Sequence, residues 1–291
     1  NLETAFRIKD DYFNAVDKVS LDLYKNEVLA IVGESGCGKS TLATTIMRLH
    51  NENLTKSTGE IIFNGKNILD LTEDEMNKIR TKDIGMIFQD PLSSLNPLHR
   101  IGKQIEEALI YHTELSAEER QKRVIELLTQ VGIPNPERCA KQYPHELSGG
   151  MRQRVMIAMA MSCKPSVLIA DEPTTALDVT IQAQILDLIK GLQAEMHAGI
   201  ILITHDLGVV AEMADRVAVL YAGEVVEIGT AEQIFKNPKH PYTRSLLRSI
   251  PQLDDEDASD DLYVIQGMVP SLKTLDRCIS SRTYPTASRR A

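Results

Sequence analysis

The chain alternates between two patterns of apolar residues. Short, nearly continuous apolar runs predict buried strands, and segments with an apolar residue at every third or fourth position predict helices. The predicted strands are "EVLAIV", "DIGMIFQD", "SVLIADEP", "GIILITHD" and the strand pair "VAVLYAGEVVEIG". The predicted helices between them are "KSTLATTIMRLH", "IQAQILDLIKGLQAEMH" and "LGVVAEMADR". Because strands and helices alternate, we expect an α/β fold around a parallel sheet.

Two shorter patterns refine this picture near the N-terminus. The segment from Ala15 to Val32 predicts two strands joined by a turn at "YKNE". The segment "GEIIFNGKNIL" predicts a hairpin, because Asn64-Gly65 between apolar residues is a typical two-residue turn.

The pattern becomes wholly helical between Pro91 and about Cys163. There the segments "RIGKQIEEALIYH", "SAEERQKRVIELLTQVG" and "MRQRVMIAMAMSC" all have helical periodicity. We therefore expect one main domain over residues 1–250 and a tail over 251–291. The expected parts of the main domain are a core over 1–89 and 164–230 and a helical insert over 90–163. Within the tail, residues 253–261 form an acidic stretch that reads as a solvated linker.

Composition narrows the classes of function. The net charge of −9 argues against a nucleic-acid-binding protein with a broad basic face. No run approaches 18 apolar residues and the N-terminus does not resemble a signal peptide, so we expect no membrane-spanning helix. The chain begins at Asn1, and we expect a few residues to be missing before it. The cysteines at 37, 139, 163 and 278 form no C-x-x-C pair, which predicts reduced thiols in an intracellular protein.

The stretch "GESGCGKST" contains the first candidate chemistry. It fulfils the pattern G-x-x-x-x-G-K-[ST] and stands between a predicted strand and a predicted helix. Its glycines allow the backbone N–H groups to turn toward an anion, and the helix N-terminus adds partial positive charge. Lys39 is expected to reach the β- and γ-phosphates of a nucleotide triphosphate, and the Ser40 hydroxyl to ligate Mg²⁺. The residues of this predicted phosphate-binding loop are Gly33, Ser35, Gly36, Cys37, Gly38, Lys39, Ser40 and Thr41.

Two further segments carry candidate functional groups. The strand "SVLIADEP" ends in Asp171, a predicted Mg²⁺ ligand, and Glu172, which is placed to orient and polarise an attacking water. The segment "LSGGMRQR" is a second glycine-rich turn that opens a helix, so Ser148, Gly149 and Gly150 form a second anion-seeking N-terminus. One nucleotide does not need two such turns from one chain. Either the chain binds two anions, or the second turn serves a nucleotide held by a partner.

Together these segments resemble the motifs of the ATPase subunits of ATP-binding-cassette (ABC) transporters, over about residues 5–250. "GESGCGKS" resembles their Walker A loop, "LSGGMRQR" their signature and "SVLIADEP" their Walker B strand. "IFQDP" with Gln89 resembles the Q-loop, "ALD" at 176–178 the D-loop and "ITHD" with His205 the switch-histidine segment. The resemblance implies a P-loop nucleotidase core with a RecA-like parallel sheet, a β subdomain and the helical insert.

The resemblance also implies roles for individual residues. Two subunits would stack head to tail and enclose two ATP molecules, each between one Walker A loop and the other subunit's signature. Gln89 would sense the γ-phosphate and couple it to membrane subunits, and His205 would contact the γ-phosphate. The implied catalytic residues are Glu172, His205 and Gln89, and the implied Mg²⁺ ligands are Ser40, Gln89 and Asp171.

The nucleotide contacts that the resemblance adds lie outside the phosphate-binding loop. They are Asp178 of the D-loop, the signature residues and an aromatic side chain that stacks on adenine. By its spacing to "AVDKVS" we choose Phe6 as this aromatic residue, with Tyr12 and Phe13 as alternatives.

Several segments indicate the branch of the family. "FQDPLSSLNPLHRIGKQI", "DEPTTALDVTIQAQILDLI" and "NPKHPYTRSLLRSIP" resemble the dipeptide/oligopeptide importers, a branch in which nickel and glutathione importers share these segments. Tails of that branch often carry a cysteine cluster suited to an iron–sulfur centre. Here Cys278 is the only cysteine in the tail and such a centre needs four ligands, so we expect none.

The sequence therefore predicts a peripheral ATPase on the cytoplasmic face of the membrane that powers peptide uptake. The resemblance implies a second ATPase subunit, more often a distinct homologue than a copy, two permease subunits and a binding protein that delivers the peptide. Three alternatives stay open. The first is an ABC ATPase of the same branch that serves nickel, glutathione or another substrate. The second is an exporter ATPase, which the segment "HPYTRSLL" disfavours. The third is a soluble cassette protein acting on ribosomes or DNA, which the single cassette and the acidic charge disfavour.

Overall fold

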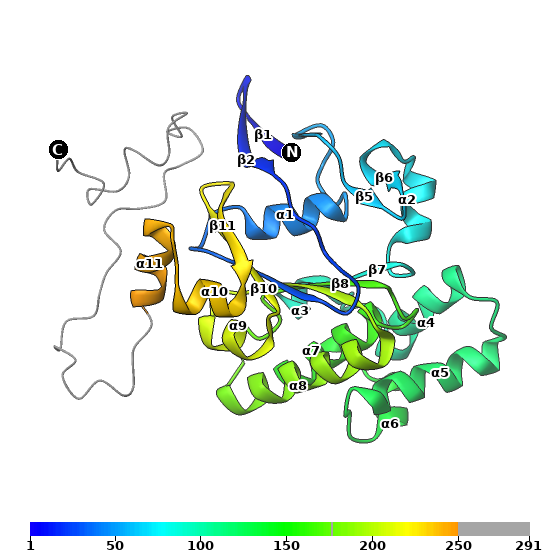
Figure 1. Ribbon diagram of the computed structural model, residues 1–291. Coiled ribbons are helices and arrows are strands. Elements are labelled where there is room, and N and C mark those ends of the chain that lie inside the picture. The colour runs from blue at the N-terminus through cyan, green and yellow to red at the C-terminus, as the bar shows by residue number, and fades with distance from the viewer. Residues whose placement is uncertain (176, 250–291) are drawn as a thin grey trace, which may run out of the picture. The chain divides into compact units, whose positions relative to one another are not determined.

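The computed structural model describes residues 1–175 and 177–249 of the chain (Figure 1). These residues divide into two compact units. The first unit comprises residues 1–22, 29–70 and the described residues from 204 onward. The second comprises residues 23–28 and 71–203, apart from Ala176. The expected tail over 251–291, with its acidic stretch and Cys278, lies outside the described residues, and so does Ala176 of the predicted D-loop.

The first unit is built mainly of strands. Its strands are β1 (Leu2–Ile8), β2 (Asp11–Val19), β3 (Val28–Val32), β4 (Thr55–Thr58), β5 (Ile62–Phe63), β6 (Lys66–Asn67), β10 (Arg216–Tyr221) and β11 (Glu224–Thr230). Its helices are α1 (Lys39–Ile46), the 3-10 turn η1 (Ile68–Asp70), α9 (Leu207–Met213), α10 (Ala231–Lys236) and α11 (Pro241–Arg248).

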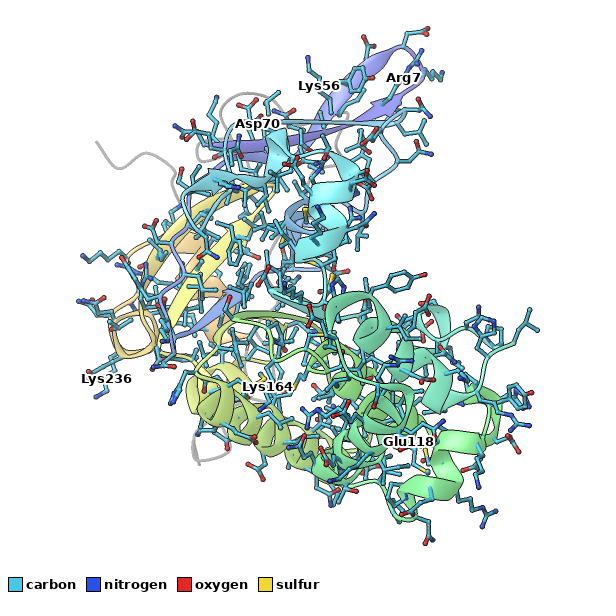
Figure 2. The ribbon with its side chains drawn as sticks, turned by 90° about the vertical axis from the view of Figure 1, so that its right-hand side faces the viewer. Arg7, Lys56, Asp70, Glu118, Lys164 and Lys236 are labelled. Atoms are coloured by element: carbon cyan, nitrogen blue, oxygen red, sulfur yellow. The ribbon has the colours of Figure 1, made fainter. Side chains whose placement is uncertain are left out.

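Two groups of strands organise this unit. In the first, β1 pairs antiparallel with β2 on one side and with β4 on the other. Arg7 of β1 and Lys56 of β4 lie near each other at one end of this group (Figure 2). In the second, β10 pairs parallel with β3 and antiparallel with β11. The core beside β3 and β10 is closed by apolar side chains of α9, α10 and α11.

The second unit carries a parallel sheet and most of the helices. Its strands are β7 (Ile84–Ile87), β8 (Val167–Asp171) and β9 (Gly199–Ile203), and β8 pairs parallel with both neighbours. Its helices are α2 (Glu73–Ile79), α3 (Pro91–Ser94), α4 (Ile101–His112), α5 (Ala117–Gln130), α6 (Pro136–Lys141), the 3-10 turn η2 (Pro144–Glu146), α7 (Gly149–Ala160) and α8 (Val179–Met196). The parallel pairings confirm the predicted α/β class.

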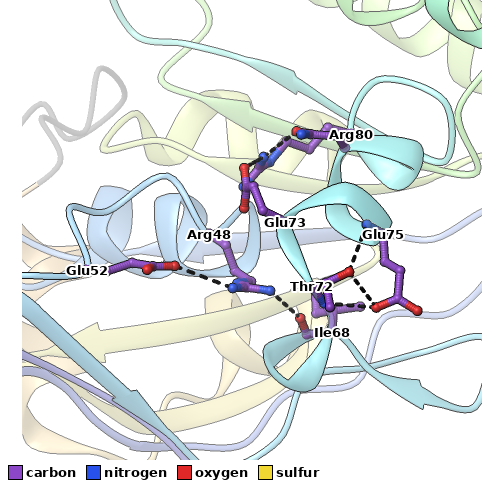
Figure 3. A network of polar contacts seen from close by, with 8 residues as sticks. Arg48, Glu52, Ile68, Thr72, Glu73, Glu75 and Arg80 are labelled. Atoms are coloured by element: carbon purple, nitrogen blue, oxygen red, sulfur yellow. Dashed lines mark hydrogen bonds and ion pairs between the residues drawn. The ribbon is translucent and has the colours of Figure 1, made fainter.

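Local chemistry explains where several elements begin. Helices α2 and α5 each start with a capping box, in which Thr72 and Glu75 or Ser116 and Glu119 satisfy each other's backbone N–H groups. Figure 3 shows the first of these boxes, and also the ion pair between Glu73 and Arg80. In the first unit the predicted hairpin is confirmed: β5 and β6 pair around Asn64 and Gly65, whose φ angles are 49° and 77°.

One predicted helix is shorter than its pattern indicated. The segment "KSTLATTIMRLH" forms α1 only as far as Ile46, because the chain turns into the left-handed region at Arg48, where φ is 49°. Backbone bonds from Arg48 to Thr45 and from Leu49 to Thr44 close this end of the helix. The Arg48 side chain then reaches the Ile68 carbonyl oxygen and Glu52 (Figure 3).

No helix among the described residues has both the length and the apolar character needed to cross a bilayer.

Candidate functional site

The predicted phosphate-binding loop lies in the first unit, between the fully buried strand β3 and helix α1. Two of its glycines are required by their surroundings. A Cβ atom on Gly33 would lie 2.2 Å from the Leu220 carbonyl oxygen, and one on Gly38 would lie 2.4 Å from the Ala15 carbonyl oxygen. The φ angles of Gly36 and Gly38 are 82° and 106°, which also favour glycine. The loop conformation therefore depends on the glycine pattern seen in the sequence.

Helix α1 offers an N-terminus suited to an anion. Its N-cap is Gly38, which contributes no side-chain hydrogen bond, and its first turn holds no acidic residue. Backbone N–H groups at a helix start attract negative charge, and here no carboxylate of the first turn competes for them. This donor set fits the phosphates of a nucleotide.

Lys39 is the cation of the loop and is 5% exposed. Its Nζ donates hydrogen bonds to the carbonyl oxygens of Gly33, at 2.8 Å, and Glu34, at 2.9 Å. Burial raises the pKa of the Glu34 carboxyl, and Lys39 acts in the opposite direction. Burial also raises the pKa of the Cys37 thiol, which disfavours the reactive thiolate form.

The predicted catalytic carboxylate lies in the second unit, directly after β8. Glu172 has a φ of 46°, an unusual conformation for a residue other than glycine. Its Oε2 accepts hydrogen bonds from Gln89 Nε2 and from Thr175 Oγ1, both at 2.9 Å. The preceding Asp171 is 4% exposed. The structure thus brings together Gln89 and Glu172, which the sequence analysis placed in separate motifs.

The predicted signature lies at the start of α7. Ser148 is the N-cap of this helix, and its hydroxyl accepts a 3.3 Å hydrogen bond from the Met151 N–H group. A Cβ atom on Gly150 would lie 3.1 Å from Cγ2 of Ile181, in the first turn of α8. Asp178 is the N-cap of α8, with Oδ1 accepting from the Ile181 N–H group at 3.0 Å. The signature and the D-loop aspartate therefore lie at neighbouring helix starts.

His205 and Phe6 belong to the first unit. His205 is exposed in the turn before α9, which is held by the Asp206 carboxylate accepting from the N–H groups of Gly208 and Val209. Phe6 lies opposite Phe13 in the β1–β2 pair, and its ring meets the His50 ring edge-on with centroids 5.2 Å apart. Tyr12 is 49% exposed. The choice of Phe6 as the adenine-stacking residue stays a prediction.

Two residues that bind Glu172 or the residue after it were not among the predicted site residues. Thr175 binds Glu172 directly, and Gln153 donates to the Pro173 carbonyl oxygen at 2.5 Å from within α7. Gln153 is 2% exposed. The sequence signal for Gln153 was its position inside the segment "LSGGMRQR". A glutamine amide buried in a helix needs a hydrogen-bond partner.

Comparison with known proteins agrees with these features. Residues 16–175 match the family "ABC transporter", and residues 226–279 match "Oligopeptide/dipeptide transporter, C-terminal region". The chain is 58% identical to the oligopeptide transport ATP-binding protein OppD of Lactococcus lactis subsp. cremoris (strain SK11), covering 94% of this chain and 81% of that protein. It is 54% identical to the dipeptide transport ATP-binding protein DppD of Bacillus subtilis (strain 168), covering 94% and 81%.

Solved structures resemble the fold. A dimeric post-hydrolysis state of the ATP-binding cassette MJ0796, bound to ADP and Pi, has a TM-score of 0.69 at 31% identity. The match covers 79% of this chain and 99% of the MJ0796 chain. CbiO1 from Clostridium perfringens, part of the ABC transporter complex cbiONQ, has a TM-score of 0.67 at 30% identity, covering 81% and 90%.

Proposed function

Since this chain belongs to the ABC transporter family, we propose that it is the ATP-hydrolysing subunit of a peptide importer and that the residues described above carry the reaction. The reaction is ATP plus water to ADP plus phosphate, coupled to transport. The observation that carries the proposal is the pair of 2.9 Å hydrogen bonds that hold the Glu172 carboxylate on Gln89 and Thr175. They support a carboxylate kept in one position, as activation of a water molecule requires.

The phosphate-binding loop supplies the electrostatic part of the mechanism. Lys39 and the N–H groups at the start of α1 would hold the negative charge that spreads over the transferred phosphoryl group. His205 would add a contact to the γ-phosphate, and Phe6 would stack on the adenine. Glu172 would orient the attacking water and accept its proton. Gln89 binds Glu172 through Nε2 and would couple the state of this carboxylate to the segment that follows Gln89.

Mg²⁺ fits the oxygen donors proposed for it. Ser40, Gln89 and Asp171 supply a hydroxyl, an amide oxygen and a carboxylate, the donors that this ion prefers. When bound, the ion would neutralise part of the phosphate charge.

The proposal extends to assembly. One Walker A loop and one signature in each chain support a head-to-tail dimer with two composite sites, and a relative of similar fold is described as dimeric. We propose a distinct homologue as the second ATPase, two permease subunits, a peptide-binding protein, and a position on the cytoplasmic face of the membrane.

Peptide uptake in cells tests this function. Cells auxotrophic for one amino acid, supplied with it only inside a peptide, should grow with the native chain and fail with Lys39→Ala. Both strains should grow on the free amino acid. Unchanged growth of the Lys39→Ala strain on peptide would refute the proposed role in peptide import.

A further inference from the structure

The first unit contains a long-range contact to the phosphate-binding loop. The Glu34 N–H group donates a 2.9 Å hydrogen bond to the Tyr242 hydroxyl, and the two residues are 208 positions apart. Tyr242 belongs to α11, in the segment "HPYTRSLL", which the reaction described above does not use. Its side chain is completely buried, and its ring lies against that of Tyr221 with centroids 4.6 Å apart.

The contact falls on the peptide group that also binds Lys39. The Gly33 carbonyl oxygen accepts from Lys39 Nζ at 2.8 Å, and the Glu34 N–H group of the same peptide donates to Tyr242. In a trans peptide the C=O and N–H bonds point in opposite directions. Lys39 and Tyr242 therefore hold one planar group from opposite sides, which fixes its rotation.

The start of α11 is built to place Tyr242. The Glu227 carboxylate of β11 accepts from the backbone N–H groups of Lys239, at 2.7 Å, and His240, at 2.9 Å. His240 is the N-cap, and its Nδ1 accepts from the Tyr242 N–H group at 3.2 Å. Pro241 occupies the first helical position, where its missing N–H costs nothing. Each residue of "HPY" thus helps to position the Tyr242 hydroxyl.

Packing keeps the tyrosine in this place. Tyr242 belongs to a buried cluster with side chains of β3, α9, β10 and α10, and Leu246 and Leu247 of α11 pack against that cluster. Because neighbouring side chains enclose the ring, the hydroxyl keeps one position and is a fixed hydrogen-bond acceptor.

We propose that Tyr242 is a positioning residue for nucleotide binding, which sets the orientation of the Gly33–Glu34 peptide and through it the place of the Lys39 ammonium. The inference rests on the proposed function, because it assigns the phosphate-binding role to Lys39. It gives the C-terminal segment of the described chain a part in nucleotide binding.

Tyr242→Phe tests the proposal, since it removes the hydroxyl and keeps the buried ring. An intramolecular hydrogen bond of this kind shifts a conformational equilibrium by about 2- to 12-fold, so ATP affinity should fall by up to that factor. We expect titration of the purified full chain with ATP and Mg²⁺ to show this loss. In the assembled transporter, KM for ATP should rise by the same factor with kcat nearly unchanged, because Glu172 is not disturbed.

Two controls make the outcome specific. Leu246→Ala weakens the packing of α11 without touching the hydroxyl, so it should lower Tm and leave ATP affinity unchanged. Lys39→Ala should abolish binding. If Lys39→Ala binds ATP normally, the proposed function itself fails. If only Tyr242→Phe binds normally, the positioning role is wrong and the function stands. Equal affinity losses in Tyr242→Phe and Leu246→Ala would also overturn the positioning role.

Amide hydrogen exchange at Glu34 gives a readout that needs no nucleotide. The Glu34 amide should exchange faster in Tyr242→Phe than in the native chain and in Leu246→Ala. Unchanged exchange in Tyr242→Phe would show that the hydroxyl does not hold this peptide group.

Discussion

Replacing Glu172 by glutamine isolates the proposed base from its surroundings. The glutamine amide oxygen can still accept from Gln89 Nε2 and Thr175 Oγ1, the two donors that lie 2.9 Å from Oε2 in the native chain. The two side chains have nearly the same size, and neither has a β-branch that would hinder the φ of 46° at this position. The exchange therefore removes the negative charge and the proton acceptor while these two hydrogen bonds and the backbone stay in place.

The expected cost follows from that single loss. General base catalysis contributes about 10²- to 10⁴-fold to a rate. The activation barrier should then rise by about 2.7–5.4 kcal/mol, at 1.36 kcal/mol for each factor of ten. Steady-state ATPase activity of the assembled transporter should fall accordingly, whereas ATP titration of the purified Glu172→Gln chain should give native affinity.

A control variant separates the loss of the base from the loss of a contact to it. Thr175→Val removes the hydrogen bond from Thr175 Oγ1 to the carboxylate and keeps the base, so it should slow turnover far less than Glu172→Gln does. Near-normal turnover of Glu172→Gln would refute the assignment of Glu172 as the base. A matching loss of ATP affinity would instead mean that the substitution disturbs binding.

Three further predictions concern other parts of the molecule. Phe6→Ala should weaken ATP affinity by about 1–3 kcal/mol, the range for a base stacked on an aromatic ring. If Phe6→Ala binds ATP normally and Tyr12→Ala binds it more weakly, the choice of Phe6 is wrong. Gly150→Asp should lower turnover at the partner's ATP by about 10³-fold, by analogy with charge-stabilising groups supplied in trans, and Gly150→Ala is the control for added bulk. Gly150→Asp combined with Lys39→Ala in this chain should leave almost no ATPase activity, because both sites are damaged. Gly150→Asp combined with a mutation of the partner's Walker A lysine should leave one working site. More activity in the first complex than in the second would refute action in trans. Burial lowers the pKa of His240, and the Glu227 carboxylate acts in the opposite direction. Neutral His240 therefore gives its full contribution to stability above the ordinary pKa of 6.5. That contribution is lost as the pH falls from 6.5 through the lowered pKa of the folded state. The Tm of the native chain should therefore drop more between pH 8 and pH 5 than that of His240→Asn, which keeps a capping acceptor without titrating in this range; parallel curves would contradict it.

Much of the candidate site is local and could be predicted from the sequence. The phosphate-binding loop could be predicted because the positive φ angles of Gly36 and Gly38 are a local requirement for glycine. The carbonyl oxygen that excludes a Cβ atom at Gly38 belongs to Ala15, 23 positions away, and is a tertiary contact. Helix starts also follow from nearby residues, because caps such as Ser148 and Asp178 bind N–H groups only three positions away. The turn at Asn64 and Gly65 belongs to the same class.

The contacts that join these pieces depend on the tertiary structure. Gln89 and Glu172 are 83 positions apart and meet because β7 and β8 are neighbours in one parallel sheet, an order that hydrophobic patterns do not specify. The end of α1 at Ile46 was missed because the apolar periodicity continues past it. In the sequence Tyr242 stands only as part of the segment "NPKHPYTRSLLRSIP", with no role of its own. Only the packing of α11 against the core of its unit brings its hydroxyl to Glu34, because pairing across 208 residues is decided by which surfaces bury each other and not by local preference.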